Sequence, residues 1–212
     1  MTDICLFPIP DCVTFPGTTF PLHVFEPRYR TMMYRALEEK RLVGICHVEK
    51  QLSPPRSDQT LEQTLNSNQA TYRPQAVFSA GLCELQEITN DGRMYLNVHI
   101  QERYRAVQEK QTLPFMVWAC EPFPDQPVSD EEHQHNLQLQ EKILMRCHAL
   151  AQQHPELQST FPEERLRGMS PAVFSFRLFG TLSFGAERQQ AILEMDSIHQ
   201  RLTEALSLLN QV

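Results

Sequence analysis

Short apolar runs occupy the first half of the sequence, and most of them partly alternate with polar residues in the manner of half-buried strands. The pattern predicts strands over 42–48, 76–88, 94–100 and 115–120. Between two of these runs, residues 90–92 read Asn-Asp-Gly, and Asp-Gly supplies the positive φ angles that a tight connection needs. The sequence therefore predicts a β-hairpin that joins 76–88 to 94–100.

One helix is predicted inside this β-rich part. Pro27 suits the first turn of a helix, and the apolar residues that follow it recur at helical spacing. They form one stripe, which we expect to face the core: Tyr29, Met32, Met33, Ala36 and Leu37.

The segment 51–72 has neither period. It is rich in Ser, Pro, Asn and Gln and contains few residues that a core could bury. Such a composition cannot offset the entropy that is lost when the chain is ordered. We therefore expect a long, mobile excursion between two strands, open to proteolysis at Arg56.

The pattern changes from the period of strands to that of helices at 122–127, where three prolines fall within six residues. These prolines predict a stiff linker. We therefore expect an α+β protein with two subdomains, a β-rich one over 1–122 and a helical bundle over 128–212.

Three helices of the second half begin at recognisable caps. Ser129 opens an S-x-x-E capping box, Ser170 precedes a proline that suits the first turn, and Asp196 can cap the last helix. Each helix has an apolar stripe that should be buried, whereas Arg201 and Glu204 should point away from theirs. The stripes are Leu137, Leu144, Cys147 and Ala151; Phe174, Leu178 and Leu182; and Ile198, Leu202, Ala205, Leu206 and Leu209.

Composition and charge narrow the possible settings and partners. A net charge of −7 disfavours binding to nucleic-acid phosphate and to anionic lipid. The six cysteines are scattered singly, without a C-x-x-C pair, and are interpreted as reduced thiols. The N-terminus lacks the bases of a signal peptide, and no run approaches the ~18 apolar residues of a membrane span. We therefore expect a soluble cytoplasmic protein.

Several motifs approach catalytic signatures, and each fails at a decisive position. Residues 180–185 have the G-x-x-x-x-G spacing of a phosphate loop, but Ala186 and Glu187 follow where Lys and Ser or Thr must hold phosphate and magnesium. Ser79 lacks the first glycine of a nucleophile elbow, because position 77 is valine. No lysine has a serine three residues before it, which removes S-x-x-K chemistry. We therefore expect neither ATPase nor peptidase activity, and no cofactor.

The eight histidines raise the question of a metal site. The closest groupings are His133 with His135 and the adjacent pairs Cys46-His47 and Cys147-His148, and none has a spacing that closes a tetrahedral site on its own. On a helix, His133 and His135 point in different directions. We therefore expect no metal ion.

The segment 15–30 combines prolines, a glycine turn, large apolar residues and a Glu/Arg pair within a short length. Its backbone is therefore predicted to follow one particular path, with Phe20 and Phe25 in the core and Glu26 paired with a nearby arginine. A rigid loop that bears aromatic and arginine side chains is also a favourable recognition surface.

Three blocks of sequence occur in an order that is far more specific than any one of them. The first block is 6–9 with 15–17 and 21–29, the second leads from 80–81 through 90–93 to 103–107, and the third is 187–194 with 201–202. With these blocks, essentially the whole chain resembles the substrate-binding N-terminal domain of the Lon proteases, and in particular the free-standing bacterial proteins built from that domain alone. Phe78 and Ile100 stand where the family usually has glycine.

The resemblance implies a fold and a function. The implied fold is a PUA-like twisted β barrel with one embedded helix, followed by a C-terminal helical bundle. The implied function is binding of unfolded or exposed polypeptide segments without unfolding or cleavage, either alone or as an adaptor for a protease or chaperone. The candidate contact residues are His23, Phe25, Arg28, Tyr29 and Arg103.

Two other classes of function stay open at this point. PUA-like barrels elsewhere bind RNA, although this chain offers only the short basic cluster at 103–105 in place of a stripe of Lys and Arg between aromatic residues. An enzyme that acts on a small molecule is the other alternative, because its groups could come from distant parts of the chain.

Overall fold

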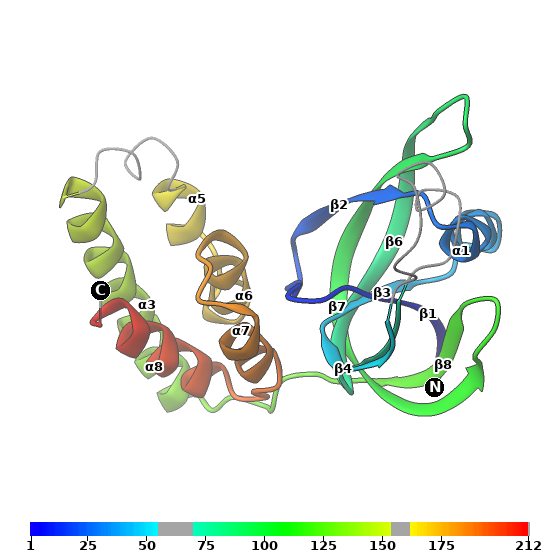
Figure 1. The fold of residues 1–212 in the computed structure, drawn as a ribbon. Coiled ribbons are helices and arrows are strands. Elements are labelled where there is room, and N and C mark those ends of the chain that lie inside the picture. Colours follow the sequence, from blue (N-terminus) through cyan, green and yellow to red (C-terminus); the bar gives the residue numbers. More distant parts are fainter. Residues whose placement is uncertain (55–69, 154–161, 212) are drawn as a thin grey trace. The chain divides into compact units, whose positions relative to one another are not determined.

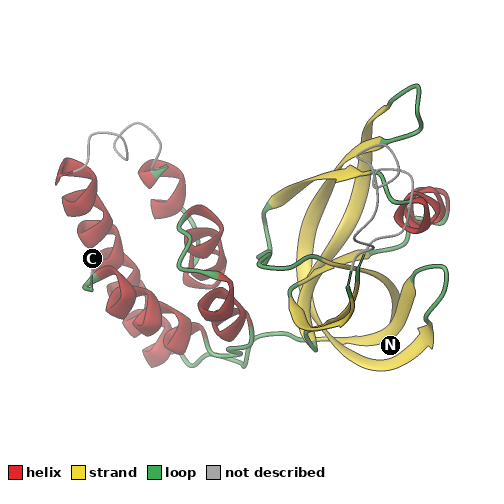
Figure 2. Cartoon of the chain, in the orientation of Figure 1, coloured by secondary structure: helices red, strands yellow, loops and turns green. Residues whose placement is uncertain are grey.

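The computed structural model describes residues 1–54, 70–153 and 162–211. The chain divides into two compact units, Met1–Phe123 and Pro124–Val212. The first unit consists of strands with one helix, and the second consists of helices (Figures 1 and 2). This arrangement confirms the predicted α+β fold class, with a near-barrel β unit followed by a helical region.

A six-stranded mixed sheet forms the first unit, in the order β2-β7-β6-β3-β1-β8. Only β1 and β3 pair in parallel; the other ladders among the described residues are antiparallel. The six strands are β1 (Thr2–Pro8), β2 (Thr19–Val24), β3 (Val43–Cys46), β6 (Val77–Ile88), β7 (Met94–Gln111) and β8 (Met116–Pro122).

The long strand β7 closes this sheet into a ring. Residues 94–99 of β7 pair with β2, and residues 104–111 pair with β8, so one strand contacts both ends of the sheet order (Figure 1). A register shift against β6 follows Ala80, and a Cβ atom on Gly81 would lie 1.8 Å from the His99 carbonyl oxygen. Only glycine fits there, which keeps the bend of the two strands in place.

The hairpin predicted at 90–92 is confirmed. Gly92 has a φ of +79°, and the Thr89 N–H donates to the Arg93 carbonyl at 2.9 Å. The prediction that the second strand ends at residue 100 is wrong, because β7 continues to Gln111. Beyond residue 100 the apolar alternation fades, but β8 supplies a ladder partner, which local sequence cannot reveal.

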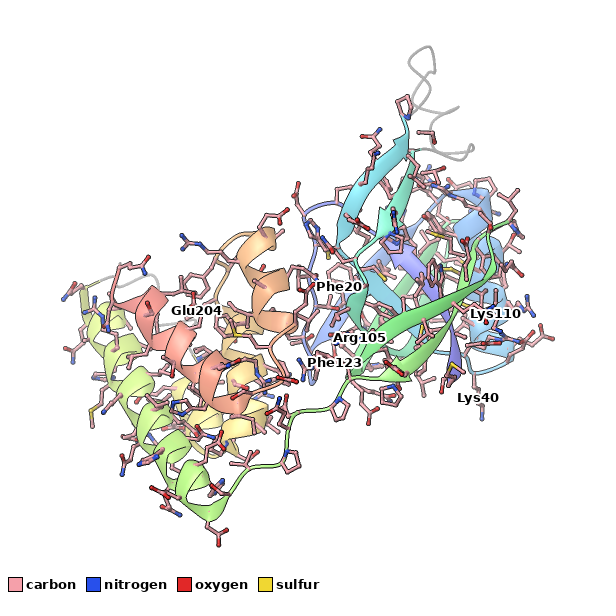
Figure 3. All side chains as sticks on the ribbon, turned by 90° about the horizontal axis from the view of Figure 1, so that it is seen from below. Phe20, Lys40, Arg105, Lys110, Phe123 and Glu204 are labelled. Carbon is pink, nitrogen blue, oxygen red and sulfur yellow. The ribbon has the colours of Figure 1, made fainter. Side chains whose placement is uncertain are left out.

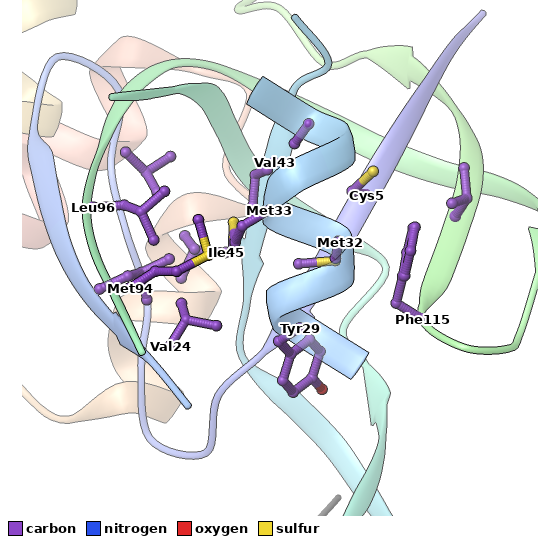
Figure 4. Close-up of a cluster of buried hydrophobic side chains, with 14 of the residues drawn as sticks. Cys5, Val24, Tyr29, Met32, Met33, Val43, Ile45, Met94, Leu96 and Phe115 are labelled. Carbon is purple, nitrogen blue, oxygen red and sulfur yellow. The ribbon is translucent and has the colours of Figure 1, made fainter. Parts of the chain in front are cut away.

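Helix α1 (Pro27–Glu38) packs against the strands of the ring (Figure 4). As predicted, Pro27 lies in the first turn, and Tyr29, Met32, Met33 and Ala36 are buried, while Leu37 is half-buried. These side chains meet Val24, Leu96 and Phe115, among others, in one apolar cluster. The buried face of the helix therefore contributes to the core of the β unit, which fixes the path of the residues at its start.

The large side chain of Phe78 is accommodated inside the β unit by a glycine on the adjacent strand. The Phe78 side chain is 1% exposed. Ala80, two residues further along β6, pairs with Gly44 on β3. A Cβ atom on Gly44 would lie 2.5 Å from the Phe78 ring. The ring thus occupies the space above a glycine on the adjacent strand.

The excursion predicted over 51–72 is wrong at both of its ends. Strand β4 (Val48–Ser53) pairs with β5 (Thr71–Pro74) in a separate antiparallel sheet, with Gln51 opposite Tyr72. Backbone pairing does not require apolar side chains, so the polar composition of 51–72 did not indicate these two strands. Residues 55–69, which include the predicted cleavage site at Arg56, lie outside the described residues.

The second unit contains a long helix and several shorter ones: α3 (Asp130–Gln153), α5 (Glu163–Arg167), α6 (Pro171–Thr181), α7 (Ala186–Leu193) and α8 (Ile198–Leu209). The caps predicted at Ser129 and Ser170 are confirmed, since each hydroxyl accepts a backbone N–H of the following turn. The cap predicted at Asp196 is wrong. Ser197 accepts from the Gln200 N–H, and the Asp196 carboxylate accepts from the Gln126 amide instead.

The buried faces of these helices differ from the predicted stripes at several positions. Arg201 is fully buried rather than turned outward, Leu137 is 39% exposed, and Leu182 and Leu206 are half-buried. Polar partners explain why Arg201 is buried and why Leu137 is exposed. The Arg201 guanidinium donates to the Asp125 carboxylate. On α3, Asn136 and Gln140 face inward, where Asn136 contacts His199 and Gln140 donates to backbone carbonyls.

Candidate functional site

The start of α1 is tied down by Arg28. Its guanidinium lies 2.9 Å from the Glu26 carboxylate and donates to the Ala70 carbonyl at 2.7 Å. The pairing of Glu26 with an arginine is therefore confirmed. The contact to Ala70 spans a long sequence separation. Arg28 thus links the first turn of α1 to the chain just before β5.

Tyr29 lies beside this arginine. The Arg28 guanidinium is 4.6 Å from the centre of the Tyr29 ring, and the other partner of that ring is Phe7, at 4.2 Å in a stacked arrangement. Tyr29 is 5% exposed, and burial raises the pKa of its phenol well above the usual range. The side chain is therefore neutral at physiological pH and contributes surface rather than charge.

Arg28 and Tyr29 line a cavity of about 330 Å³ in the first unit. Three segments surround it: the first turn of α1, the β4–β5 sheet, and the connection from β7 into β8. Most of its large side chains are apolar or aromatic. Besides Tyr29, they are Leu52, Tyr72, Leu113, Phe115, Met116 and Trp118.

The apolar lining runs from the surface to the core. Leu113 is 80% exposed and Leu52 is 59% exposed, whereas Phe115 is 3% exposed and belongs to the core cluster. Polar groups in the lining are engaged nearby: Arg73 pairs with Glu49 at 3.0 Å, and the Thr112 hydroxyl donates to Glu109. The cavity therefore offers mainly apolar contact, at the lower end of the range of roughly 300–1,000 Å³ for ligand pockets.

His23 and Phe25 lie elsewhere, in an aromatic cluster with Tyr95. The His23 and Tyr95 rings are stacked 4.5 Å apart with an interplanar angle of 7°, and the Phe25 ring lies 5.8 Å from His23. His23 is exposed, Tyr95 is 40% exposed, and Phe25 is half-buried rather than in the core as predicted. The outward faces of β2 and β7 therefore present a second patch of aromatic surface.

Arg103 occupies a third place and is 4% exposed. Its guanidinium lies 4.7 Å from the centre of the Phe123 ring, and the Arg105 guanidinium lies at the same distance (Figure 3). The structure thus separates the five predicted contact residues. Arg28 and Tyr29 meet at the cavity, His23 and Phe25 form part of the aromatic cluster, and Arg103 holds the end of the β unit.

Sequence reasoning missed most of the cavity wall. Leu52 and Tyr72 fall in the segment that was predicted to be a mobile excursion, so nothing marked them as wall residues. Two signals were available in the last part of the wall. Trp118 is the one tryptophan of the chain, and the apolar pair Leu113-Pro114 follows a run of polar residues.

The side chains that could act as nucleophiles are poorly placed for it. Burial raises the pKa of Cys5 to about 11 and that of Cys120 to about 12, so these thiols stay protonated at neutral pH. Ser79 is buried in β6 and donates to the Thr14 carbonyl at 2.8 Å, as expected of a strand serine.

A row of polar side chains crosses the outer faces of β2, β7 and β6. His99 contacts the Thr19 hydroxyl at 3.3 Å through one ring nitrogen and the Glu84 carboxylate at 2.8 Å through the other. This hydroxyl, imidazole and carboxylate follow the order of a hydrolase relay. The side chains of His99 and Glu84 are, however, 47% and 60% exposed, and water weakens such pairs. The row fits a solvated strand surface.

Two searches of the described ranges complete the inventory of possible sites. Across 1–54, 70–153 and 162–211, no three His, Cys, Asp or Glu side chains gather in a way that could hold a metal ion. No helix in these same ranges has both the length and the apolar character needed to cross a membrane.

A near-barrel ring with an embedded helix and a following helical region is the architecture of Lon N-terminal domains. The family model of the ATP-dependent protease La (LON) substrate-binding domain matches residues 3–211. The chain therefore belongs to this family, which confirms the resemblance seen in the sequence. A search of curated proteins gave no match.

Two solved structures show the same fold. One is a Lon N-terminal domain protein from Xanthomonas campestris, with 20% identity, 98% of each chain covered and a TM-score of 0.57. The other is the N-terminal domain of the Mycobacterium avium complex Lon protease, with 14% identity, 98% of each chain covered and a TM-score of 0.67. At these identities the likeness extends to the fold alone.

Proposed function

We propose that this chain binds exposed apolar segments of other polypeptides without changing them chemically, by accepting a large apolar side chain in the cavity between α1, the β4–β5 sheet and β8. The observation that carries the proposal is the apolar lining, which reaches from exposed Leu113 to buried Phe115. Membership of a substrate-binding family supports polypeptide binding in general. Delivery of the bound segment to a protease or chaperone is the further role that we propose.

The expected strength of this interaction suits such a task. Full burial of one large apolar side chain contributes about 1.5 to 3 kcal/mol, so a single cavity gives weak binding that tolerates many sequences. A module that surveys unfolded segments needs this tolerance, because the segments share apolar character rather than a motif. The candidate contacts Arg28 and Tyr29 would then act mainly by shaping the wall.

Charge placed at the mouth of the cavity tests the proposal. We expect Leu113→Glu and Leu52→Glu each to weaken binding of a fluorescently labelled, reduced and carboxymethylated protein by about tenfold in an anisotropy titration. Both leucines are largely exposed, so the fold should persist.

Met145→Glu is the matched control, because Met145 is 62% exposed on α3, in the other unit. It should leave the dissociation constant unchanged. Equal binding by all three variants and the original chain would refute the cavity as the binding site.

A further inference from the structure

Strand β2 ends the order of the six-stranded sheet. At the other end, β8 also pairs with β7, whereas β2 pairs with β7 alone among the described strands. The side of β2 away from β7 is therefore an open edge within residues 1–54 and 70–123, in blue in Figure 1. Open edges expose backbone groups that can pair with another chain.

The direction of these backbone groups follows from one contact. The Ile100 N–H donates to the Thr18 carbonyl at 2.9 Å, so the backbone groups of Ile100 point toward β2. Alternate residues of β7 repeat this orientation, and their register partners on β2 are the even-numbered residues. The backbone groups of Thr19, Pro21 and His23 therefore point to the open edge.

Pro21 makes this edge incomplete. Proline has no N–H, and its position fits the open side of an edge strand. The edge still offers the N–H groups of Thr19 and His23 and the carbonyls of Thr19, Pro21 and His23. The gap breaks the continuous ladder that copies of this chain would need to pair strongly, and it leaves enough groups for a short segment.

The side chains next to the edge favour particular neighbours. His23 points outward from β2 and stacks on Tyr95, with Phe25 close by. Aromatic and β-branched residues pair best with such a cross-strand platform.

We propose that the open edge of β2 binds a short extended segment of an unfolded polypeptide by strand addition, with an aromatic or β-branched residue beside His23. This inference rests on the proposed function, because it specifies how and which polypeptide segments bind. The backbone contacts provide affinity without regard to sequence, and the aromatic side chains provide the preference.

Backbone methylation of a peptide gives the sharpest test. The probe is a short labelled peptide in which tyrosine alternates with serine, flanked by lysines, so that only one register places aromatic residues beside His23. It is made in two forms, each N-methylated at alternate amides in one of the two frames. Strand addition turns only one frame of amides toward β2, so one form should bind about tenfold or more weaker than the other. Equal binding of the two forms would overturn the proposal.

Variants of the protein locate the bound peptide. Tyr95→Ala should weaken binding of the unmethylated peptide, and Pro21→Ala should tighten it by adding an N–H to the edge. Tyr34→Ala is the control, because Tyr34 is an aromatic residue that is 48% exposed on helix α1 rather than on β2 or β7, and it should have no effect. Unchanged affinity in both test variants would overturn the assignment to β2.

The test separates this inference from the cavity. If Leu113→Glu weakens binding of the carboxymethylated protein by about tenfold while the two methylated peptides bind equally, the cavity stands and strand addition fails. If the peptides differ but Leu113→Glu has no effect, the edge stands and the cavity fails. Sedimentation of the protein alone addresses self-pairing: a dimer that Tyr95→Ala makes monomeric would show that the edge serves a second copy, which overturns the proposed occupant.

Discussion

Arg201 and Asp125 show how a charged pair can be placed in the interior of the second unit. Both guanidinium Nη atoms lie 2.6 Å from the two carboxylate oxygens, Nε donates to Ser175 at 3.0 Å, and Nη1 also donates to the Met195 carbonyl. The Phe176 ring lies 4.0 Å from the guanidinium carbon. Nε and both Nη atoms of Arg201 thus have hydrogen-bond partners, which offsets the cost of burying an arginine.

Removing the acid should destabilise the second unit strongly. We expect Asp125→Asn to lower the free energy of unfolding by about 3 to 5 kcal/mol, because it leaves a buried charge without its counter-ion. Urea unfolding followed by circular dichroism measures this change. The exposed pair of Arg167 and Glu141 is the control, and Glu141→Gln should have little effect. A small change in Asp125→Asn would mean that water reaches the pair.

Individual contacts of this kind were only partly predictable. Glu26 and Arg28 are close in sequence, so their pairing could be anticipated from the local composition. Arg201 and Asp125 are separated by many residues, and the helical period alone placed Arg201 on the outer face. The cavity wall was equally hard to predict, because Leu52 and Phe115 are distant in sequence and line the same cavity only in the folded β unit.

Elements were more predictable than contacts, because their signals are local. The Asn-Asp-Gly turn, Pro27 at the start of α1 and the serine caps of α3 and α6 all specify backbone geometry within a few residues. The β4–β5 sheet lacked such a signal, since its polar residues pair through the backbone. Wrong assignments arose where the partner strand, rather than the local sequence, determined the structure.

Helix α8 offers a test at the scale of an element. Leu202 is fully buried, and Leu206 is half-buried. We expect Leu202→Ala to lower the free energy of unfolding by about 2 to 5 kcal/mol, through lost transfer free energy and the remaining cavity. Leu206→Ala should cost clearly less, because part of its side chain is already in water. Denaturant unfolding of the two variants decides, and equal losses would contradict the burial pattern of α8.

At the scale of the whole molecule, the family model spans both units, and each unit has its own core. In the β unit, α1 packs one face into the core and carries two of the predicted contact residues to the cavity wall. The same packing that stabilises the ring therefore shapes the surface that we propose for binding. The fold could be anticipated from motif order, whereas the site depends on contacts between three distant segments.

Trp118 provides a direct measurement of the central claim, because the single tryptophan of the chain lies in the cavity wall. We predict that titration with a reduced, carboxymethylated protein that lacks tryptophan changes the Trp118 emission in a saturable way. Leu113→Glu should move the midpoint of that change to a concentration about tenfold higher. Binding that anisotropy detects while the Trp118 emission stays constant would contradict the account, because the polypeptide would then occupy a surface other than the cavity.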